Sequence, residues 1–292
     1  MQAKPIMSGY EGNIRKICKI EKECKMKEIE GVGLTDVQDI YNGPVGDLWE
    51  LVMGEQIHVG GLPSSMELLG ASGVGEGKSG VDLCCCSGAG MRFLVRFGNV
   101  DAVHGVDATK KVVDRGIIRN QEEGVADRIS FTVADACDTG LPADQADFVW
   151  GEDAWCYVED KPALIKEAAR IAKPGGTIAF TDWVLGETEM TDEEAHRFLD
   201  FMKFPNMESI PGYSKLLEDN GCEIVQARNT GRYAEYIGLY YDMLTKQLTY
   251  DALKIINFNM DLMNALGGEM LFMQKLANEG KITQGLFVAR KK

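Results

Sequence analysis

The 292-residue sequence predicts an α/β fold with a seven-stranded, mostly parallel sheet and helices on both of its faces. From residue 81 onward, short apolar runs alternate with helical segments, which is the pattern of β-α-β units. A turn of small residues follows the first run, and carboxylates stand at the ends of later runs. These observations favour one sheet whose carboxyl edge binds a ligand.

The strands of this sheet are expected at seven short apolar runs, namely residues 81–85, 102–106, 129–133, 146–150, 177–181, 223–225 and 285–289. A helix over 162–172 should end at Lys173-Pro-Gly-Gly176, which is a helix stop followed by a tight turn. Another helix lies over 213–219. The last run comes only after a long, mostly helical insertion, so one strand joins the sheet late in the chain.

The segment before the sheet is expected to be helical with glycine-rich breaks. Residues 47–53 and 64–69 form two helices, separated by a turn at Gly60-Gly61. The apolar spacing in residues 1–30 fits a helix imperfectly, so this stretch predicts a marginal helix or a mobile arm. The basic stretch 15–27 is interleaved with glutamates and indicates a solvated helix face.

Composition excludes some classes of function. The net charge of -14 and pI near 4.8 oppose binding to a nucleic-acid backbone. No run of about 18 apolar residues and no signal-peptide pattern occur, so we expect no membrane partner and a cytoplasmic location. Eight cysteines without a C-x-x-C pair or a disulfide-type spacing fit reduced thiols.

Residues 81–90 are the most informative block. An apolar strand runs into a small-residue turn and then a helix over 91–97, which brings backbone amides against a ligand. A dinucleotide fingerprint needs glycine three residues after Gly90, and Phe93 stands there instead. The sequence therefore argues against NAD, which remains a weak alternative.

Two further strands end in carboxylates. Asp107 follows the second strand, where a carboxylate can hold a ribose diol by two hydrogen bonds. Asp135 and Ala136 follow the third strand, where they could bind an adenine edge. An acid after the third strand favours S-adenosylmethionine (SAM) over NAD. The fourth strand runs into a polar and aromatic loop at 150–157, which is our candidate for the reaction centre.

These residues resemble class I SAM-dependent methyltransferases, which have a Rossmann-like core. Within that class the sequence is similar to sarcosine/dimethylglycine N-methyltransferases and their phosphoethanolamine and tocopherol methyltransferase relatives, over roughly residues 35–292. The matching pieces are Ile57-His58-Val59-Gly60, Arg92-Phe-Leu-Val-Arg96, Glu152-Asp-Ala154, Lys173-Pro-Gly-Gly176, Thr181-Asp-Trp183 and Gly280-Lys-Ile-Thr-Gln-Gly-Leu-Phe.

The strand ends and the resemblance together imply a set of site residues. The expected contacts of SAM, and of its product S-adenosylhomocysteine, are Asp82, Cys84, Cys86, Ser87, Gly88, Arg92, Asp107, Ala108, Asp135, Ala136 and Glu152. The expected catalytic residues are His58, Asp153, Trp155 and Tyr157. The expected substrate contacts are Trp183, Arg232, Tyr236 and Tyr240. For the aromatic residues ordinary packing is the alternative, for His58 a loop hydrogen bond, and for Arg232 a surface charge.

The sequence departs from the family at the first strand. The family reads Asp-x-Gly-x-Gly-x-Gly, whereas Cys84 and Cys86 replace two of these glycines here. Glycine allows positive φ and close backbone approach, so we expect weaker SAM binding or a reshaped pocket. Three adjacent cysteines on a strand point to alternate faces and serve one tetrahedral metal poorly, so no metal is expected.

The resemblance implies in-line attack by a small-molecule acceptor on the methyl group of SAM. Sarcosine or dimethylglycine, giving betaine, is the first expectation, and aromatic side chains would stabilise the methylated cation. The alternatives are a phosphobase, phenol, thiol or halide acceptor, or a SAM-binding protein without turnover. The expected organisation is an N-terminal helical arm or lid (1–70), a SAM-binding core (71–230), a helical substrate lid (231–281) and a last core strand (282–292), in a possible homo-oligomer.

Overall fold

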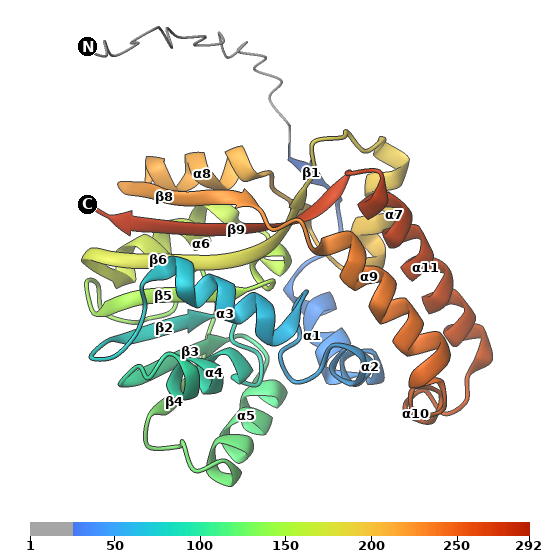
Figure 1. Cartoon of the computed structure of the whole chain (residues 1–292), viewed down its shortest axis with the longest axis horizontal. Helices are drawn as coiled ribbons and strands as arrows, with labels where there is room; N and C mark the ends of the chain where they lie inside the picture. The colour runs from blue at the N-terminus through green and yellow to red at the C-terminus, as the bar shows by residue number, and fades with distance from the viewer. Residues whose placement is uncertain (1–25) are drawn as a thin grey trace, which may run out of the picture.

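The computed structural model of this chain describes residues 26–292. The helix or arm expected in residues 1–30 and the basic stretch 15–27 lie almost entirely outside the described residues, as do Cys18 and Cys24. Within the described part, Figure 1 shows a twisted sheet with helices packed on it and a second group of helices beyond one end of the strands.

The central sheet has seven strands in the order β4-β3-β2-β5-β6-β9-β8. Only β9 runs antiparallel to its neighbours, so the predicted mostly parallel α/β sheet is confirmed. The strands are β2 (Ser79–Leu83), β3 (Ala102–Asp107), β4 (Ile129–Val133), β5 (Ala146–Glu152), β6 (Ala172–Leu185), β8 (Cys222–Asn229) and β9 (Ile282–Lys291). The carboxyl ends of the other six strands therefore share one edge, which creates the place for a ligand.

The Lys173–Gly176 segment, expected as a tight turn, lies inside β6. The pairing of β5 with β6 shifts register between Ala146 and Phe148, so the segment forms an irregular bulge in the strand. Gly175 adopts φ +75° in this bulge, where a residue with a side chain would be strained. The sequence correctly indicates an irregular backbone at this segment, but β6 pairs with β5 on both sides of it.

Helices cover both faces of the sheet. On one face α3 (Gly61–Ser72) and α4 (Ala89–Phe97) bury Leu68, Met91 and Leu94 against the strands. On the other, α6 (Lys161–Ile171) and α8 (Ile210–Asp219) bury apolar side chains against the same sheet. The helix α5 (Lys110–Glu122) follows β3. Burial on both faces explains why the central strands are almost continuously apolar.

The remaining helices form a separate cluster beyond the carboxyl edge of the sheet, at the right of Figure 1. Its members are α1 (Leu34–Asn42), α2 (Pro44–Met53), α7 (Asp192–Met202), α9 (Tyr233–Asp242), a π-helical turn (Met243–Gln247), α10 (Thr249–Ile255) and α11 (Met260–Asn278). A short 3₁₀ turn, η1 (Trp155–Tyr157), follows β5. The strands β1 (Lys27–Glu28) and β7 (Asn206–Met207) pair nearby. The site is thus enclosed between sheet and helices.

Local sequence signals explain where several of these helices begin. The α6 helix begins at Asp160, whose carboxylate accepts the Ala163 amide at 2.9 Å, and a proline stands in its first turn. The α7 helix begins with a capping box between Thr191 and Glu194. These caps satisfy backbone amides that would otherwise lack partners.

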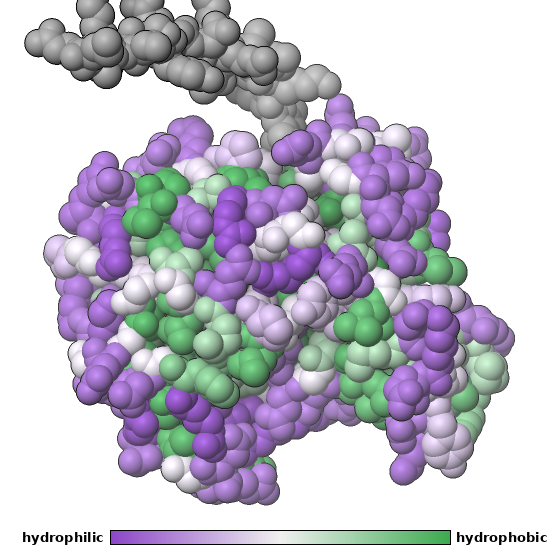
Figure 2. Space-filling view, in the orientation of Figure 1, coloured by the Kyte–Doolittle hydropathy of each residue, from purple (hydrophilic) through white to green (hydrophobic). Residues whose placement is uncertain are grey.

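The surface drawn in Figure 2 is mostly polar at its edges. Apolar side chains gather over α3 and α4 and again beside α9, where Leu62, Met66, Phe97 and Leu239 are exposed. Among the helices of the described residues, none is both long enough and apolar enough to cross a lipid bilayer.

Candidate functional site

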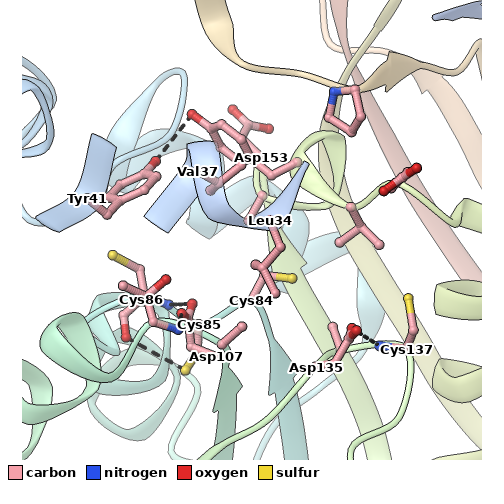
Figure 3. A pocket seen from close by; sticks show the side chains of 18 of the residues that line it. Leu34, Val37, Tyr41, Cys84, Cys85, Cys86, Asp107, Asp135, Cys137 and Asp153 are labelled. Carbon is pink, nitrogen blue, oxygen red and sulfur yellow. Dashed lines mark hydrogen bonds between the residues drawn. The ribbon is translucent and has the colours of Figure 1, made fainter. Parts of the chain in front are cut away.

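A cavity of about 1250 Å³ lies at the carboxyl edge of the sheet. Figure 3 shows α1 on one side, with Leu34, Val37 and Tyr41, and the strand ends on the other, with Cys84, Asp107 and Asp135. Single small-molecule sites usually have about 300–1000 Å³, so there is room for a cofactor and an acceptor together. The expected residues that line it are His58, Asp82, Cys84, Cys86, Ser87, Asp107, Ala108, Asp135, Ala136, Glu152, Asp153 and Tyr157.

The turn between β2 and α4 adopts a backbone that suits glycine. Cys84 has φ +61° and Cys86 has φ +49°, both in the left-handed region. A residue with a side chain pays about 1–2 kcal/mol for this conformation. The turn therefore keeps the shape that two glycines allow in the resembling family, at a cost in strain. Burial raises the pKa of the Cys84 thiol, and that of the Cys86 thiol to about 12.

Two buried carboxylates meet across Gly90. A Cβ added to Gly90 would lie 2.9 Å from Glu152 Oε2 and 3.3 Å from Asp82 Oδ2, so a side chain at this position would displace the Glu152 carboxylate. Burial and the neighbouring Glu152 raise the pKa of Asp82 well above its usual value. Glu152 Oε2 is buried and has no hydrogen-bond partner among the described residues. This pair is suited to a cationic group of a ligand.

The carboxylates at the ends of β3 and β4 fix local turns. Asp107 accepts the backbone amides of Cys86 and Thr109, both at 2.8 Å, which ties the β2–α4 turn to the end of β3. Burial raises the pKa of Asp107. Asp135 accepts the Cys137 amide at 2.8 Å (Figure 3). Both side chains line the cavity, so they could also contact the ribose and adenine of a nucleotide.

His58 lies beside the carboxylate pair. Its Nε2 is 3.1 Å from the Ser65 hydroxyl, which also donates to Glu152 at 2.7 Å. The ring is 3% exposed, and its Nδ1 has no hydrogen-bond partner among the described residues. A buried imidazole nitrogen at the wall of a cavity can accept or hand on a proton there.

Asp153 is held from two sides. The amide of Val59 donates to its Oδ2 at 2.7 Å, and the side-chain amide of Gln284 donates to both of its carboxylate oxygens. Burial raises the pKa of Asp153, while these hydrogen bonds and His58 oppose that rise. Gln284 is not among the residues expected from the sequence, because it comes from β9 and no local pattern relates it to the loop after β5.

Tyr41 and Tyr157 face each other across the cavity wall. Their hydroxyls are 3.3 Å apart, and their rings form an edge-to-face pair with centroids 5.8 Å apart. Burial raises the pKa of both phenols. Tyr41 is also not among the residues expected from the sequence, because α1 was not predicted as a helix of its own. An apolar or aromatic residue every three to four positions in 34–41 was the available signal.

A small chamber of about 20 Å³ adjoins the main cavity. Its walls are mostly aromatic and apolar, and four wall residues belong to both spaces. The chamber is lined by Tyr41, Trp49, Met53, Ile57, Asp153, Tyr157, Trp183 and Met202. Trp183, an expected substrate contact, therefore lies at this chamber, whereas Trp49 was not anticipated.

Some expected residues lie elsewhere. Trp155, proposed as catalytic, is fully buried, stacks on Phe180 with centroids 4.0 Å apart and donates to the Leu83 carbonyl. Its indole fills the core, because the 3₁₀ turn after β5 directs it under the sheet edge rather than into the cavity. This position removes the basis for a direct catalytic role. Tyr157, two residues on, is at the cavity wall.

Arg92 and Gly88 shape the site without lining it. The guanidinium of Arg92 is 4% exposed, donates to the Ser87 carbonyl at 2.7 Å and pairs with Glu55 at 2.8 Å. Gly88 caps the start of α4 with φ +77°. Both support the turn between β2 and α4, so a direct contact to a cofactor is not indicated by their placement.

The expected substrate contacts on α9 also lie behind the cavity wall. Arg232 pairs with Glu67 and donates to Gln284 at 3.4 Å. The hydroxyl of Tyr240 accepts the Gly60 amide at 3.0 Å, and Tyr236 lies beside it. None of the three lines either cavity. Tyr240 and Arg232 contact the loop that carries His58 at Gly60, whereas Tyr236 packs against Tyr240.

No group of three or more His, Cys, Asp or Glu side chains within residues 26–292 is arranged to hold a metal ion. The cysteines that line the cavity lie along one turn and its neighbour, among them Cys84, Cys86 and Cys137.

Comparison with known proteins identifies a methyltransferase domain over residues 81–180, which covers the turn and the strand ends described above. The chain is 26% identical over 247 residues to a probable chloroplastic tocopherol O-methyltransferase of Oryza sativa subsp. japonica, covering 74% of this chain and 67% of that protein. It is 24% identical over 250 residues to phosphoethanolamine N-methyltransferase 3 of Arabidopsis thaliana, covering 83% of this chain but 48% of that enzyme. The chain thus spans about half of the latter's length.

Solved structures show the same fold. A putative sarcosine dimethylglycine methyltransferase from Galdieria sulphuraria superposes with a TM-score of 0.74 at 22% identity, covering 88% of this chain and 98% of that one. Phosphoethanolamine N-methyltransferase 2 of Haemonchus contortus, in complex with SAM, gives a TM-score of 0.78 at 20% identity, covering 90% of this chain and 60% of that one.

Proposed function

We propose, on the premise that this chain is a class I SAM-dependent methyltransferase of the small-molecule type, that its methyl acceptor is an amine. The observation that carries this proposal is the placement of Asp153, which lines both the main cavity and the aromatic chamber, while His58 lines the wall of the main cavity. A carboxylate and an imidazole can hold an ammonium and take its proton, while aromatic faces favour the methylated cation. Sarcosine and dimethylglycine, the first expectation, fall in this class.

The residues along the strand ends fit SAM. When bound, SAM supplies an electrophilic methyl group on a sulfonium. Asp82 and Glu152 suit its ammonium, because Glu152 Oε2 is buried without a partner and Gly90 leaves space beside both carboxylates. Asp107 suits the ribose hydroxyls, and Asp135 suits the adenine amino group. Ser87 and the backbone amides at the start of α4 can receive the carboxylate of the methionine part.

The acceptor would be prepared by this chain's own groups. Removal from water lowers the pKa of an ammonium, because burial disfavours its charged form. Asp153, held at both oxygens, would orient the N–H and accept the proton, and the free Nδ1 of His58 offers a second acceptor. Tyr41 and Tyr157 would close the chamber over the nitrogen. Positioning and exclusion of water account for most of the expected rate gain.

The test is methyl transfer by the purified full-length chain, followed as release of S-adenosylhomocysteine, with a panel of amines, phenols and thiols at equal concentration. We expect turnover with amines, and loss of turnover with retained SAM binding in Asp153→Asn. Glu223→Gln, an exposed change on β8, is the matched control and should behave like the wild type. Turnover only with phenols or thiols would refute the amine assignment. SAM binding without any turnover would instead support a non-catalytic SAM-binding protein.

We place the chain in the cytoplasm, without a nucleic-acid partner, on the basis of its net charge of -14 and reduced-type cysteine pattern. The division into an N-terminal segment (1–70), a SAM-binding core (71–230), a lid (231–281) and a last strand (282–292), and a possible homo-oligomer, are proposals of the same kind. Size-exclusion chromatography with light scattering checks the last of these.

A further inference from the structure

The charges that line the main cavity are nearly all negative. Ten of its described lining residues are aspartate or glutamate, against one lysine and one histidine. Besides the carboxylates at the strand ends, they include Glu28, Glu30, Glu159 and Asp160. Away from Ser87 and the amides at the start of α4, which are the proposed partners of the SAM carboxylate, a carboxylate or phosphate group that enters this space meets like charges at close range, which disfavours its binding.

The one lysine of this lining is already engaged. Lys161 Nζ donates to the carbonyl oxygens of Val158 at 2.5 Å and Cys156 at 3.2 Å, and the residue is 1% exposed. Burial lowers the pKa of its ammonium. Lys161 therefore holds the loop after β5 together and offers little to a ligand.

The arginines around the cavity are also engaged, because each forms an ion pair with a glutamate. Arg92 pairs with Glu55 at 2.8 Å, and Arg115 pairs with Glu50 at 3.0 Å. Arg119 pairs with the same Glu50. None of these guanidinium groups lines the cavity. Within residues 26–292, then, no unpaired Lys or Arg side chain is presented to an anionic acceptor.

The adjoining chamber offers aromatic faces instead. Tyr41, Trp49, Tyr157 and Trp183 line it, with Asp153 as its one charged residue. Its volume of about 20 Å³ is close to the space that a single water molecule or methyl group occupies. Aromatic rings around a carboxylate attract an alkylammonium through cation–π and Coulomb interactions.

We propose that the acceptor is a secondary or tertiary amine without a carboxylate or phosphate group, bound with one N-alkyl substituent in the chamber and its nitrogen beside Asp153. This inference rests on the amine methylation proposed above, and it departs from the first expectation, because sarcosine and dimethylglycine both carry a carboxylate. The acceptor ammonium gives its proton to the Asp153 carboxylate. The freed lone pair then forms the N–C bond, while the S–C bond breaks and its electron pair stays on the sulfur of S-adenosylhomocysteine. The proton finally leaves to water.

Three acceptors with one amine head test this inference on the full-length protein with SAM. N,N-dimethylethanolamine has a neutral tail, dimethylglycine has a carboxylate, and N,N-dimethylethanolamine phosphate has a phosphate. We expect kcat/KM for dimethylethanolamine to exceed both others by about tenfold or more, because only its tail avoids the acidic lining. Equal or faster turnover of either anionic acceptor would overturn the inference. If none of the three is methylated although SAM binds, the proposed amine methylation itself has failed.

A pair of charge-reversal variants separates the acidic lining from overall charge. Glu159 is exposed and lines the cavity, whereas Glu223 is exposed on β8 and does not. In Glu159→Lys we expect the preference for dimethylethanolamine over dimethylglycine to shrink several-fold, while Glu223→Lys, with the same change in net charge, leaves it unchanged. An unchanged preference in Glu159→Lys would show that the lining does not discriminate and would overturn the proposal.

Discussion

The side-chain amide of Gln284 donates to both carboxylate oxygens of Asp153, at 3.0 and 2.8 Å, across 131 positions of sequence. The same nitrogen donates to the Val59 carbonyl at 3.0 Å, and Asp153 accepts the Val59 amide. Three segments of the chain thus converge on one buried carboxylate. Asp153 also has φ +51°, a conformation that persists only where the surroundings hold it.

Replacement of Gln284 by methionine should move the pH dependence of catalysis. The hydrogen bond from Gln284 lowers the pKa of Asp153 and so opposes the effect of burial. Without it the pKa rises, and the acidic limb of the kcat/KM profile moves to higher pH by about one unit, since a hydrogen bond to a charged group contributes about 1.5–3 kcal/mol. Gln226→Met on β8 is the control. A uniform loss of activity at every pH would indicate a purely structural role.

Asp107→Ala should weaken SAM binding by about 10–100-fold, because hydrogen bonds of a carboxylate are worth about 1.5–3 kcal/mol. The substitution also removes the acceptor of two hydrogen bonds, which the backbone amides of Cys86 and Thr109 donate to Asp107. Isothermal titration with SAM and S-adenosylhomocysteine measures the change. Asp114→Ala on α5, which removes an exposed ion pair with Lys110, should leave the affinity unaltered. An unaltered affinity in Asp107→Ala would contradict the proposed cofactor site.

Glycine should be tolerated unusually well at Cys86. Glycine removes the strain of the left-handed backbone, which raises the free energy of unfolding by about 1–2 kcal/mol. The extra freedom of glycine in the unfolded chain lowers it by about 0.4–1 kcal/mol. Cys137 lines the same cavity without positive φ, so Cys137→Gly has no such relief. Urea unfolding should therefore find Cys86→Gly more stable than Cys137→Gly by about 1–2 kcal/mol. The reverse order would mean that the turn is not strained.

Stability should fall between pH 4 and 7 in part because of Asp182. Burial raises the pKa of this carboxyl to about 7, although Lys161 and the Tyr213 hydroxyl oppose the rise. Because the folded-state pKa lies above the unfolded one, the contribution of Asp182 is fully present below about pH 4 and is lost as pH rises to about 7. Unfolding free energies at pH 5, 6, 7 and 8 measure this slope. Asp182→Asn should flatten it, and parallel curves for both proteins would contradict the assignment.

Much of the fold could be predicted because its signals are local. The runs at 102–106 and 129–133 match β3 and β4 almost residue for residue, since short, mainly apolar runs between helical segments indicate strands. The pairing of β1 with β7 was missed. Each of these strands has two residues, and about 180 positions separate them, so neither periodicity nor turn chemistry indicates their contact.

The candidate site was predicted in part for the same reason. Asp107 and Asp135 stand at strand ends, and the parallel topology brings such ends to one edge. Trp155 and Tyr157 are equally aromatic and two residues apart, but only the turn after β5 decides that one enters the core and the other the cavity. Tyr41 and Gln284 reach the site through tertiary packing, so the helical spacing in 34–41 and the strand pattern of β9 predict the elements but not their contact with the site.

The position of β9 has a consequence for synthesis on the ribosome. This strand lies between β6 and β8, yet it follows both of them in the chain. All the strand ends that line the cavity, from β2 to β5, have left the exit tunnel long before Gln284 is made. A nascent chain could therefore fold the part that contains β2 to β6 early, with one edge of β6 unpaired. The hydrogen bonds from Gln284 to Asp153 form only after β9 has been made. Translation itself would order the two halves of the site, and a chain stalled before β9 would be able to capture ligand but not to turn it over.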